Sequence, residues 1–324
     1  MGAKLDYQKL KNIRVEKDIT QKSLSQIIHI NQNTLKAIET GRIICDKTTL
    51  KKITDELGVD IDDVYIEDYH RTKVICVVNN KGGSGKTSVA GSLGYALSEQ
   101  GNKILLIDSD MQANLTHSFG LDSNEKNLGV ALLKEQSLEN YIVKTKYDLI
   151  DMVVSDLGMS TIEMSLFNKM QRESILKHIL TPVIELGIYD YVIIDTNPTL
   201  AVLNFNVLNA SNFCIIPVTA DSFGVENIDT VLDFIKGVQK FNKELEHVKI
   251  LLNKYDMRTK TITLKCEEYV RSNFSDILLN TILSIDTNMQ NAQYNNVPVL
   301  EFKTNSRIAK EYRNLCKEIV KIAR

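Results

Sequence analysis

The feature that most constrains this chain is a glycine-rich loop between an apolar strand and a helix. Residues 73–78 form a short β-branched run, which is typical of a buried parallel strand. The sequence Asn-Lys-Gly-Gly-Ser-Gly-Lys-Thr follows at residues 80–87, and a helix-like stretch continues to Gln100. In such a loop the backbone N–H groups converge on a phosphate, and the dipole of the following helix favours the anion. The sequence therefore predicts a nucleoside triphosphate site on an α/β sheet.

The side chains of this loop have distinct expected roles. Lys86 supplies a positive charge to the phosphates, and the hydroxyl of Thr87 is a ligand for magnesium. Asn80 stands where the general pattern has glycine, but asparagine tolerates left-handed backbone angles better than most residues. The residues expected to contact the nucleotide are Gly82, Gly83, Ser84, Gly85, Lys86, Thr87 and Ser88.

Two further apolar runs end in carboxylates. Asp108 and Asp110 follow the run at residues 103–107, and Asp195 ends the run that begins at residue 191. Because ligands bind at the C-terminal ends of strands in a doubly wound sheet, these acids are expected beside the phosphate loop. Asp110 can then orient the attacking water, while Asp108 and Asp195 hold magnesium. Each acid alone is consistent with a strand-end cap. The glycine-rich loop followed by two apolar runs that end in carboxylates favours a nucleotide and magnesium site.

The first part of the chain has a different pattern. From residue 7 to about residue 64 the apolar residues fall at helical spacing in short bursts, which predicts four or five short helices. One is expected over residues 7–16, and Thr20 can cap the next. A turn at residues 29–31 leads to a helix over residues 32–39, which Thr40 and Gly41 end. Two short helices joined by a tight turn make a helix-turn-helix.

This run resembles the helix-turn-helix family of phage repressors and Cro, the XRE family. The similarity rests on a Thr-Gln pair at residues 20–21, which opens the second helix, and on Ile-Glu-Thr-Gly at residues 38–41, which closes the third. It implies that polar side chains pair with base edges in the major groove of DNA. A degenerate helical domain kept for protein contacts is the alternative, because the fold hosts both uses. The candidate DNA-binding residues in this part are Gln21, Gln32, Asn33 and Lys36.

The chain of 324 residues has a formal net charge of −2, but its charges are segregated. Residues 1–52 carry 11 basic and 5 acidic side chains, and residues 248–324 carry 13 and 8, whereas residues 73–247 carry 14 and 21. The basic ends favour contacts with a polyanion, although solvated helix faces explain each segment about equally well. No apolar run reaches the roughly 18 residues of a membrane-spanning helix, so we expect a cytoplasmic protein. Five scattered cysteines indicate reduced, mostly buried thiols.

Residues 73–324 resemble the ParA-type partition ATPases over nearly their full length. Lys81, just before the paired glycines, is typical of the deviant Walker ATPases, and the resemblance implies that it reaches the phosphates of a partner subunit across an ATP-sandwiched dimer. The pattern Asp-x-Asp-x-Gln-x-Asn-x-Thr at residues 108–116 is similar to the ParA version of the second motif and differs from the MinD version, which lacks this Gln and Thr. The same resemblance implies that Asn253 and Pro298 line the adenine pocket and that Arg258 binds DNA.

Two positions depart from the family pattern. After Asp195 the family has Asp-x-Pro-Pro, whereas this chain has Asp-Thr-Asn-Pro. The segment at residues 285–291, where many relatives carry arginine, has no cation and one acid, although phosphate binding depends on the number of Lys and Arg side chains. The basic residues that could take over this role are Lys254, Arg258, Lys260, Lys265, Arg307 and Lys310.

The expected architecture is a doubly wound, mostly parallel α/β sheet over residues 71–324, with a small all-α helix-turn-helix domain over residues 1–70. Further helices are expected over residues 129–145, 159–184 and 305–322, and a strand over residues 149–154. The resemblance implies a cytoplasmic, nucleoid-associated ATPase that uses ATP and Mg²⁺, forms an ATP-dependent homodimer and works with a ParB-like centromere-binding protein. The helix-turn-helix would then bind a specific operator and the ATPase dimer nonspecific DNA.

Two other hypotheses remain open at this point. The first is a transcription regulator of a plasmid or mobile element, in which ATP switches dimerisation and no cargo is moved; the cation-poor segment at residues 285–291 motivates it. The second is a MinD-like positioning ATPase at a membrane. We disfavour it because the apolar stripe of the last helix has the width of a normal core-facing helix.

Overall fold

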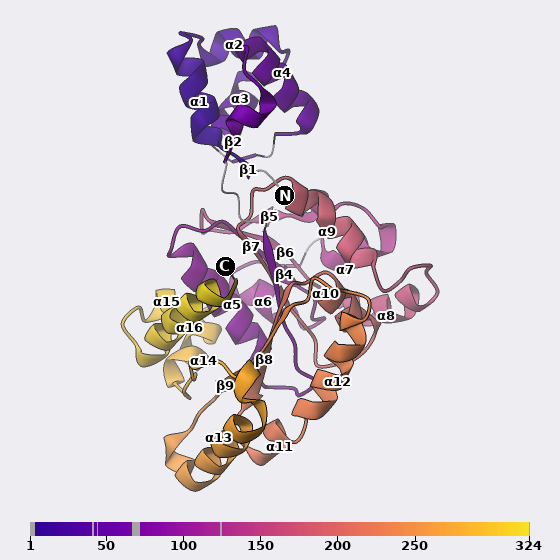
Figure 1. Ribbon diagram of the computed structural model, residues 1–324, viewed down its shortest axis with the longest axis vertical. Coiled ribbons are helices and arrows are strands. Elements are labelled where there is room, and N and C mark those ends of the chain that lie inside the picture. The colour runs from indigo at the N-terminus through magenta and orange to yellow at the C-terminus, as the bar shows by residue number, and fades with distance from the viewer. Residues whose placement is uncertain (1–3, 41, 44, 67–71, 124, 324) are drawn as a thin grey trace. The chain divides into compact units, whose positions relative to one another are not determined.

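In the computed structural model, the glycine-rich loop follows an inner strand of a seven-stranded sheet (Figure 1). The structure describes residues 4–40, 42–43, 45–66, 72–123 and 125–323. The chain divides into two compact units, residues 1–72 with 182–190 and residues 73–181 with 191–324. The expected domain boundary at residues 70 and 71, and Gly41 at the end of the third helix, lie outside the described residues.

Short helices build the N-terminal unit, as the apolar spacing predicts. Side chains cap their N-termini: Thr20 accepts a hydrogen bond from Ser23 N at 3.0 Å, and Asn31 accepts one from Asn33 N at 2.8 Å. A two-residue antiparallel pair was not predicted, because strands of this length show no alternation. The elements are β1 (Lys4–Leu5), α1 (Tyr7–Glu16), α2 (Gln21–Ile27), α3 (Gln32–Glu39), α4 (Lys47–Leu57), the 3₁₀ turn η1 (Ile61–Val64) and β2 (Tyr65–Ile66).

A buried ion pair ties α1 to α3 in this unit. Arg14 donates to both carboxylate oxygens of Glu39, at 2.5 and 3.0 Å, and also to the carbonyl of Ile19 at 2.6 Å. Both charged side chains are almost fully buried among apolar residues. Two hydrogen bonds of this geometry fix the angle between the helices, and they leave neither charge without a partner.

The sheet of the second unit has the strand order β5-β6-β4-β7-β3-β8-β9. All neighbouring strands are parallel except the edge pair β5–β6. The inner strands are buried on both faces, which matches their continuous apolar runs. The strands are β3 (Lys73–Val77), β4 (Ile104–Asp108), β5 (Val143–Lys144), β6 (Ile150–Val153), β7 (Tyr191–Asp195), β8 (Phe213–Thr219) and β9 (His247–Asn253).

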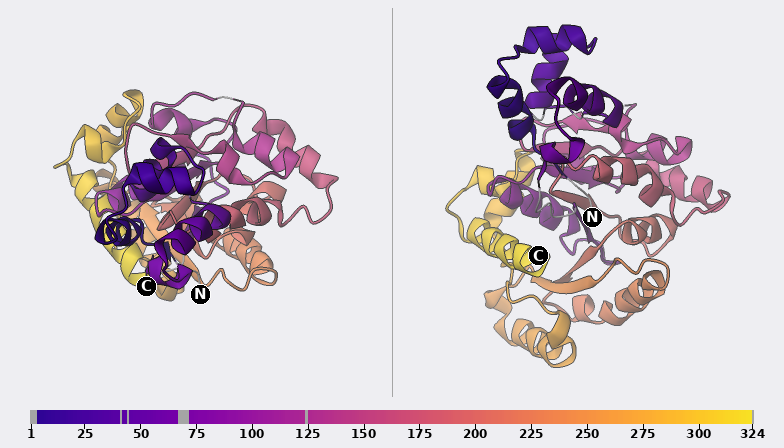
Figure 2. Two further views of the ribbon diagram at one scale, coloured as in Figure 1. Left: turned by 90° about the horizontal axis from the view of Figure 1, so that it is seen from above. Right: turned by 45° about the horizontal axis from the view of Figure 1, so that its top comes forward.

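Helices cover both faces of this sheet, so the fold is the expected doubly wound α/β type. Helices α5, α15 and α16 lie on one side and α8, α10 and α12 on the other (Figures 1 and 2). The bounds are α5 (Lys86–Ser98), α6 (Asn114–Ser118), α7 (Leu128–Lys134), η2 (Leu138–Tyr141), α8 (Met159–Phe167), α9 (Ile175–Glu185), α10 (Val202–Asn209), α11 (Ser222–Val225), α12 (Ile228–Gln239), η3 (Met257–Thr259), α13 (Lys260–Phe274), η4 (Ser275–Ile277), α14 (Thr287–Tyr294), α15 (Val299–Phe302) and α16 (Arg307–Ala323).

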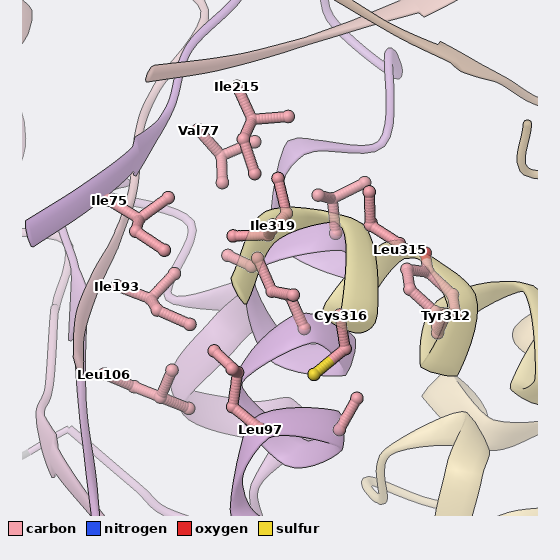
Figure 3. Close-up of a cluster of buried hydrophobic side chains, with 14 of the residues drawn as sticks. Ile75, Val77, Leu97, Leu106, Ile193, Ile215, Tyr312, Leu315, Cys316 and Ile319 are labelled. Atoms are coloured by element: carbon pink, nitrogen blue, oxygen red, sulfur yellow. The ribbon is translucent and has the colours of Figure 1, made fainter. Parts of the chain in front are cut away.

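The apolar stripe of α16 packs into the core. Tyr312, Leu315 and Ile319 lie with side chains of the strands in one buried cluster, and in Figure 3 Ile319 lies closer to Ile75 and Ile193 than the other two do. This stripe is therefore a core-facing surface, as expected, and not a membrane contact. Among the described residues, no helix is long and apolar enough to cross a membrane.

Two of the expected helices are shorter than predicted. The expected helix at residues 129–145 ends at Lys134, where Glu135 adopts a left-handed backbone with φ of 50°, and a 3₁₀ turn and strand β5 follow. The expected helix at residues 159–184 is interrupted at residues 168–174, where Gln171 has φ of 51°. The apolar spacing misled here because Leu138 and Tyr141, in the 3₁₀ turn, are also buried.

Replacing Glu39 by glutamine removes the charge that compensates Arg14. Because the unpaired guanidinium stays buried, we expect the free energy of unfolding of the N-terminal unit to fall by about 3 kcal/mol. Thermal unfolding of the full chain, followed by far-ultraviolet circular dichroism, should show this loss of stability as a first transition at lower temperature. The exposed Glu56→Gln variant on α4 is the matched control, and equal transitions for both variants would contradict the assigned role.

Candidate functional site

The glycine-rich loop forms an open backbone cradle at the start of α5. Gly83 and Gly85 have φ of 72° and 95°, a conformation that other residues rarely adopt. No side chain caps the N-terminus of α5, so its first N–H groups stay available to a ligand. A Cβ on Gly85 would lie 2.2 Å from Nδ2 of Asn253, which donates to the carbonyl of Ser84 at 2.7 Å. Glycine at position 85 therefore lets β9 brace the loop.

Lys86 is the buried cation of the site. Its side chain is only slightly exposed, and its Nζ donates to the carbonyl of Lys81 at 3.1 Å. Burial lowers the pKa of Lys86, while the nearby carboxylates of Asp195 and Asp110 act in the opposite direction. The ammonium is held at the base of the cradle, where it can neutralise phosphate charge.

Asp108 and Asp195 lie opposite each other at the ends of neighbouring strands. The parallel register of β4 and β7 pairs the two residues directly. Oδ2 of Asp108 accepts from the backbone N and the hydroxyl of Thr116, at 2.9 and 2.8 Å. Burial raises the pKa of Asp108 to about 6, although the hydrogen bonds from Thr116 oppose that rise.

Asp195 is fully buried, and neither of its carboxylate oxygens has a hydrogen-bond partner. Its pKa is raised well above the ordinary value by burial and then by the charge of Asp108, while Thr87 and Lys86 favour its charged form. A bound cation would stabilise the charged form of this buried carboxylate, and oxygen ligands suit magnesium. Among the described residues no cluster of three His, Cys, Asp or Glu side chains forms a protein-only cage, so phosphate and water would complete the coordination. The residues present fit Mg²⁺.

Asp110 lies nearer the opening. It is 8% exposed, its Oδ1 accepts from Gln112 N at 3.0 Å, and its own N donates to Asp108 at 3.1 Å. The second carboxylate oxygen of Asp110 makes none of these contacts. This geometry is compatible with a carboxylate that orients a water next to the phosphates.

Lys81 does not point into the cradle of its own chain. Its Nζ lies 2.8 Å from Oδ1 of Asp221 and donates to the hydroxyl of Thr219 at 3.0 Å. Both partners belong to the end of β8 and the turn after it. The sequence did not single out Asp221, although its place two residues after the end of β8 resembles the strand-end signal that pointed to Asp108.

Most of the predicted nucleotide residues line one open cavity of about 1330 Å³. Asn253 and Pro298, predicted to line an adenine pocket, lie on its wall together with Met289 and Gln293 of α14. No sequence signal pointed to these two α14 residues. The predicted residues that line the cavity are Gly82, Gly83, Gly85, Lys86, Thr87, Ser88, Asp110, Asn253, Arg258 and Pro298. Ser84 is buried in the loop, and its hydroxyl has no hydrogen-bond partner.

The candidate DNA-binding side chains differ in their exposure and in whether another side chain already binds them. Gln32, Asn33 and Lys36 are exposed on α3. The amide of Gln21 donates to Glu39 at 2.7 Å, which fixes its side chain beside the buried ion pair. Arg258 is exposed but donates to both carboxylate oxygens of Asp256, and this pairing lowers the pKa of Asp256 and reduces the charge available to a phosphate.

Models of two protein families match this chain. An AAA domain matches residues 72–247 and a helix-turn-helix matches residues 10–64. The chromosome-partitioning ATPase Soj of Treponema pallidum is 33% identical over 253 residues, which cover 76% of this chain and 97% of that protein.

Solved structures with a similar fold contain nucleotides. A plasmid partition protein of Borrelia burgdorferi bound to AMPPNP has a TM-score of 0.65 at 27% identity, covering 78% of this chain and 99% of that one. Cobyrinic acid a,c-diamide synthase of Mycobacterium smegmatis, with an ATP analogue and magnesium, has a TM-score of 0.66 at 27% identity, covering 77% of this chain and 95% of that one.

Replacing Gly85 by alanine tests the cradle. The added Cβ would meet Nδ2 of Asn253 and strain a backbone with φ of 95°. We expect the affinity for ATP to fall by about tenfold, the equivalent of about 1.4 kcal/mol. Isothermal titration calorimetry with ATP measures this affinity. Gly237→Ala on α12, where an added Cβ meets nothing within 4 Å, is the matched control; unchanged affinity in Gly85→Ala would contradict the cradle geometry.

Proposed function

The chain belongs to the ParA-type partition ATPases and carries an N-terminal helix-turn-helix, and from this membership we propose that it is a DNA segregation ATPase whose homodimer closes around ATP. It is an ATPase whose cofactors are ATP and Mg²⁺. The observation that carries the proposal is the cradle itself: one buried lysine and three carboxylates meet at the open N-terminus of a helix.

The residues of the site have different proposed roles in phosphoryl transfer, according to where they lie. The N–H groups of the loop and Lys86 bind the phosphates and compensate their charge. Thr87, Asp108 and Asp195 would hold magnesium, which when bound supplies charge neutralisation at the phosphates. Asp110 accepts a hydrogen bond from the attacking water and so directs the oxygen of that water toward the terminal phosphate. The proposal includes slow hydrolysis that a ParB-like partner stimulates.

Lys81 completes the site of the opposite subunit in this proposal. In a single chain its ammonium is compensated by Asp221, so the chain alone offers the nucleotide only one lysine of its own loop. Dimerisation around ATP would exchange that carboxylate for the partner's phosphates, which carry more charge. The pair with Asp221 is half-exposed and therefore weak enough to exchange.

Replacing Lys81 by alanine should abolish ATP-dependent dimerisation and leave the binding of ATP to the single chain nearly unchanged. We expect the dimer dissociation constant to rise by about a hundredfold, because the partner's phosphates lose a charge-assisted contact. Light scattering after size-exclusion chromatography, with a non-hydrolysable ATP analogue, measures the mass. The surface variant Lys240→Ala should dimerise normally. A Lys81→Ala chain that still dimerises with the analogue argues against the sandwich.

We also propose two modes of DNA contact for a cytoplasmic, nucleoid-associated protein. Exposed amides on α3 support reading of an operator, and thereby autoregulation of the partition genes. Lys254, Lys260 and Lys265 are exposed near the cavity-lining Arg258 and support nonspecific binding by the ATPase dimer.

A regulator without cargo remains the second candidate, and two observations favour it. The segment at residues 285–291 carries no cation, and Arg258 is neutralised by Asp256. In that case the only DNA contact would be the specific one, and ATP would switch the spacing of two helix-turn-helix units.

Fluorescence anisotropy of a nonspecific DNA duplex separates the two candidates. The full-length variant Gln32→Ala, Asn33→Ala, Lys36→Ala disables the reading helix and leaves the ATPase intact. For a partition ATPase we expect this variant to bind the duplex with ATP and Mg²⁺ but not with ADP, with affinity falling by about tenfold or more between 50 and 200 mM salt. Loss of all binding in both nucleotide states would favour the regulator.

A further inference from the structure

A hydrogen bond joins α14 to the first turn of α5 across the nucleotide cavity. Nε2 of Gln293 donates to Oγ of Ser88 at 2.9 Å, and both residues line the cavity. Ser88 is the third residue of α5, beside the open N–H groups that face the ligand. Gln293 thus contacts a predicted phosphate-binding residue from an element about 200 positions away in the sequence.

The direction of this hydrogen bond determines what Ser88 can do. A serine hydroxyl has one hydrogen to donate and two lone pairs to accept. Because the Gln293 amide donates to Oγ, it occupies a lone pair and leaves the hydroxyl hydrogen free. That hydrogen can then be donated to a phosphate oxygen, and donation by the amide polarises the hydroxyl in the favourable sense.

The segment that leads into α14 is held by side chains of α16. Arg307 donates to the carbonyl of Ile285 at 2.6 Å, and Glu311 accepts from the backbone N and the hydroxyl of Ser284, at 2.7 and 2.8 Å. Asp286 caps α14 by accepting from Asn288 N at 2.9 Å. A supporting group held in this way contributes more than a mobile one, because less side-chain and loop motion is lost when the ligand binds.

We propose that Gln293 is a positioning residue for the nucleotide. It holds the Ser88 hydroxyl with its hydrogen directed at the phosphate chain, and so strengthens ATP binding without itself touching the phosphates. The inference rests on the proposed phosphate contact of Ser88. Through this hydrogen bond, α14 contributes to nucleotide binding.

The isosteric Gln293→Glu variant is the sharpest test, because it inverts the hydrogen bond. A carboxylate can only accept, so it takes the Ser88 hydrogen away from the phosphate and adds a negative charge near it. We expect the dissociation constant for ATP and Mg²⁺, measured by isothermal titration calorimetry on the full chain, to rise by about tenfold in Gln293→Glu and by about threefold in Gln293→Ala. Asn291→Ala, an exposed amide on the same helix, should bind like the wild type.

A double-mutant cycle with Ser88→Ala shows whether Gln293 acts through the hydroxyl. In the Ser88→Ala background, Gln293→Ala should cause no further loss of affinity. Additive losses, or a Gln293→Glu chain that binds ATP like the wild type, would overturn the inference. A wild-type chain that binds no ATP would instead contradict the proposed function. Melting temperatures equal to that of the wild type confirm that the variants fold.

Discussion

The burial of like charges at one end of the sheet is the constraint on which the site depends. Parallel pairing of β4 and β7 places Asp108 opposite Asp195, and both carboxylates are excluded from water. Thr116 satisfies Asp108, whereas the carboxylate of Asp195 makes no hydrogen bond of ordinary geometry and has Thr87 and Lys86 to favour its charged form. Burying these two carboxylates lowers the stability of the empty protein. A bound cation would restore that stability, and this gain would contribute to the affinity for the cation.

The two lysines of the loop show how sequence neighbours acquire different tasks. Lys86 opens α5, where burial holds its ammonium beside the helix terminus, the proposed phosphate site of its own chain. Lys81 leaves the same loop in another direction and pairs with Asp221 at the end of β8. A partly exposed pair of this kind stabilises little, which is compatible with the proposed exchange of partners. The loop thus combines a fixed cation with an exchangeable one.

The N-terminal unit has a different physical basis. Its small core cannot contribute much burial, and the ion pair of Arg14 with Glu39 fixes α1 against α3 instead. Glu39 also holds the amide of Gln21, so the orientation of a predicted DNA-binding side chain depends on the same carboxylate. The geometry of the proposed DNA-reading surface and the stability of the unit are therefore coupled.

The sequence by itself determined the fold class, the phosphate loop and the helix-turn-helix, because these depend on local order: strand, glycines, Lys-Thr, helix, and short capped helices. It also predicted Asp110, Asp195 and Asn253 as site residues through strand ends and family resemblance, and these roles stay predictions. Only the tertiary structure decided that Lys81 pairs with Asp221, that Asp195 lacks a partner, and that Gln293 reaches Ser88. These contacts join residues far apart in the chain, and no local pattern encodes such distances. Where local spacing misled, at residues 129–145 and 159–184, left-handed turns interrupt helices while the apolar residues in and around them stay buried.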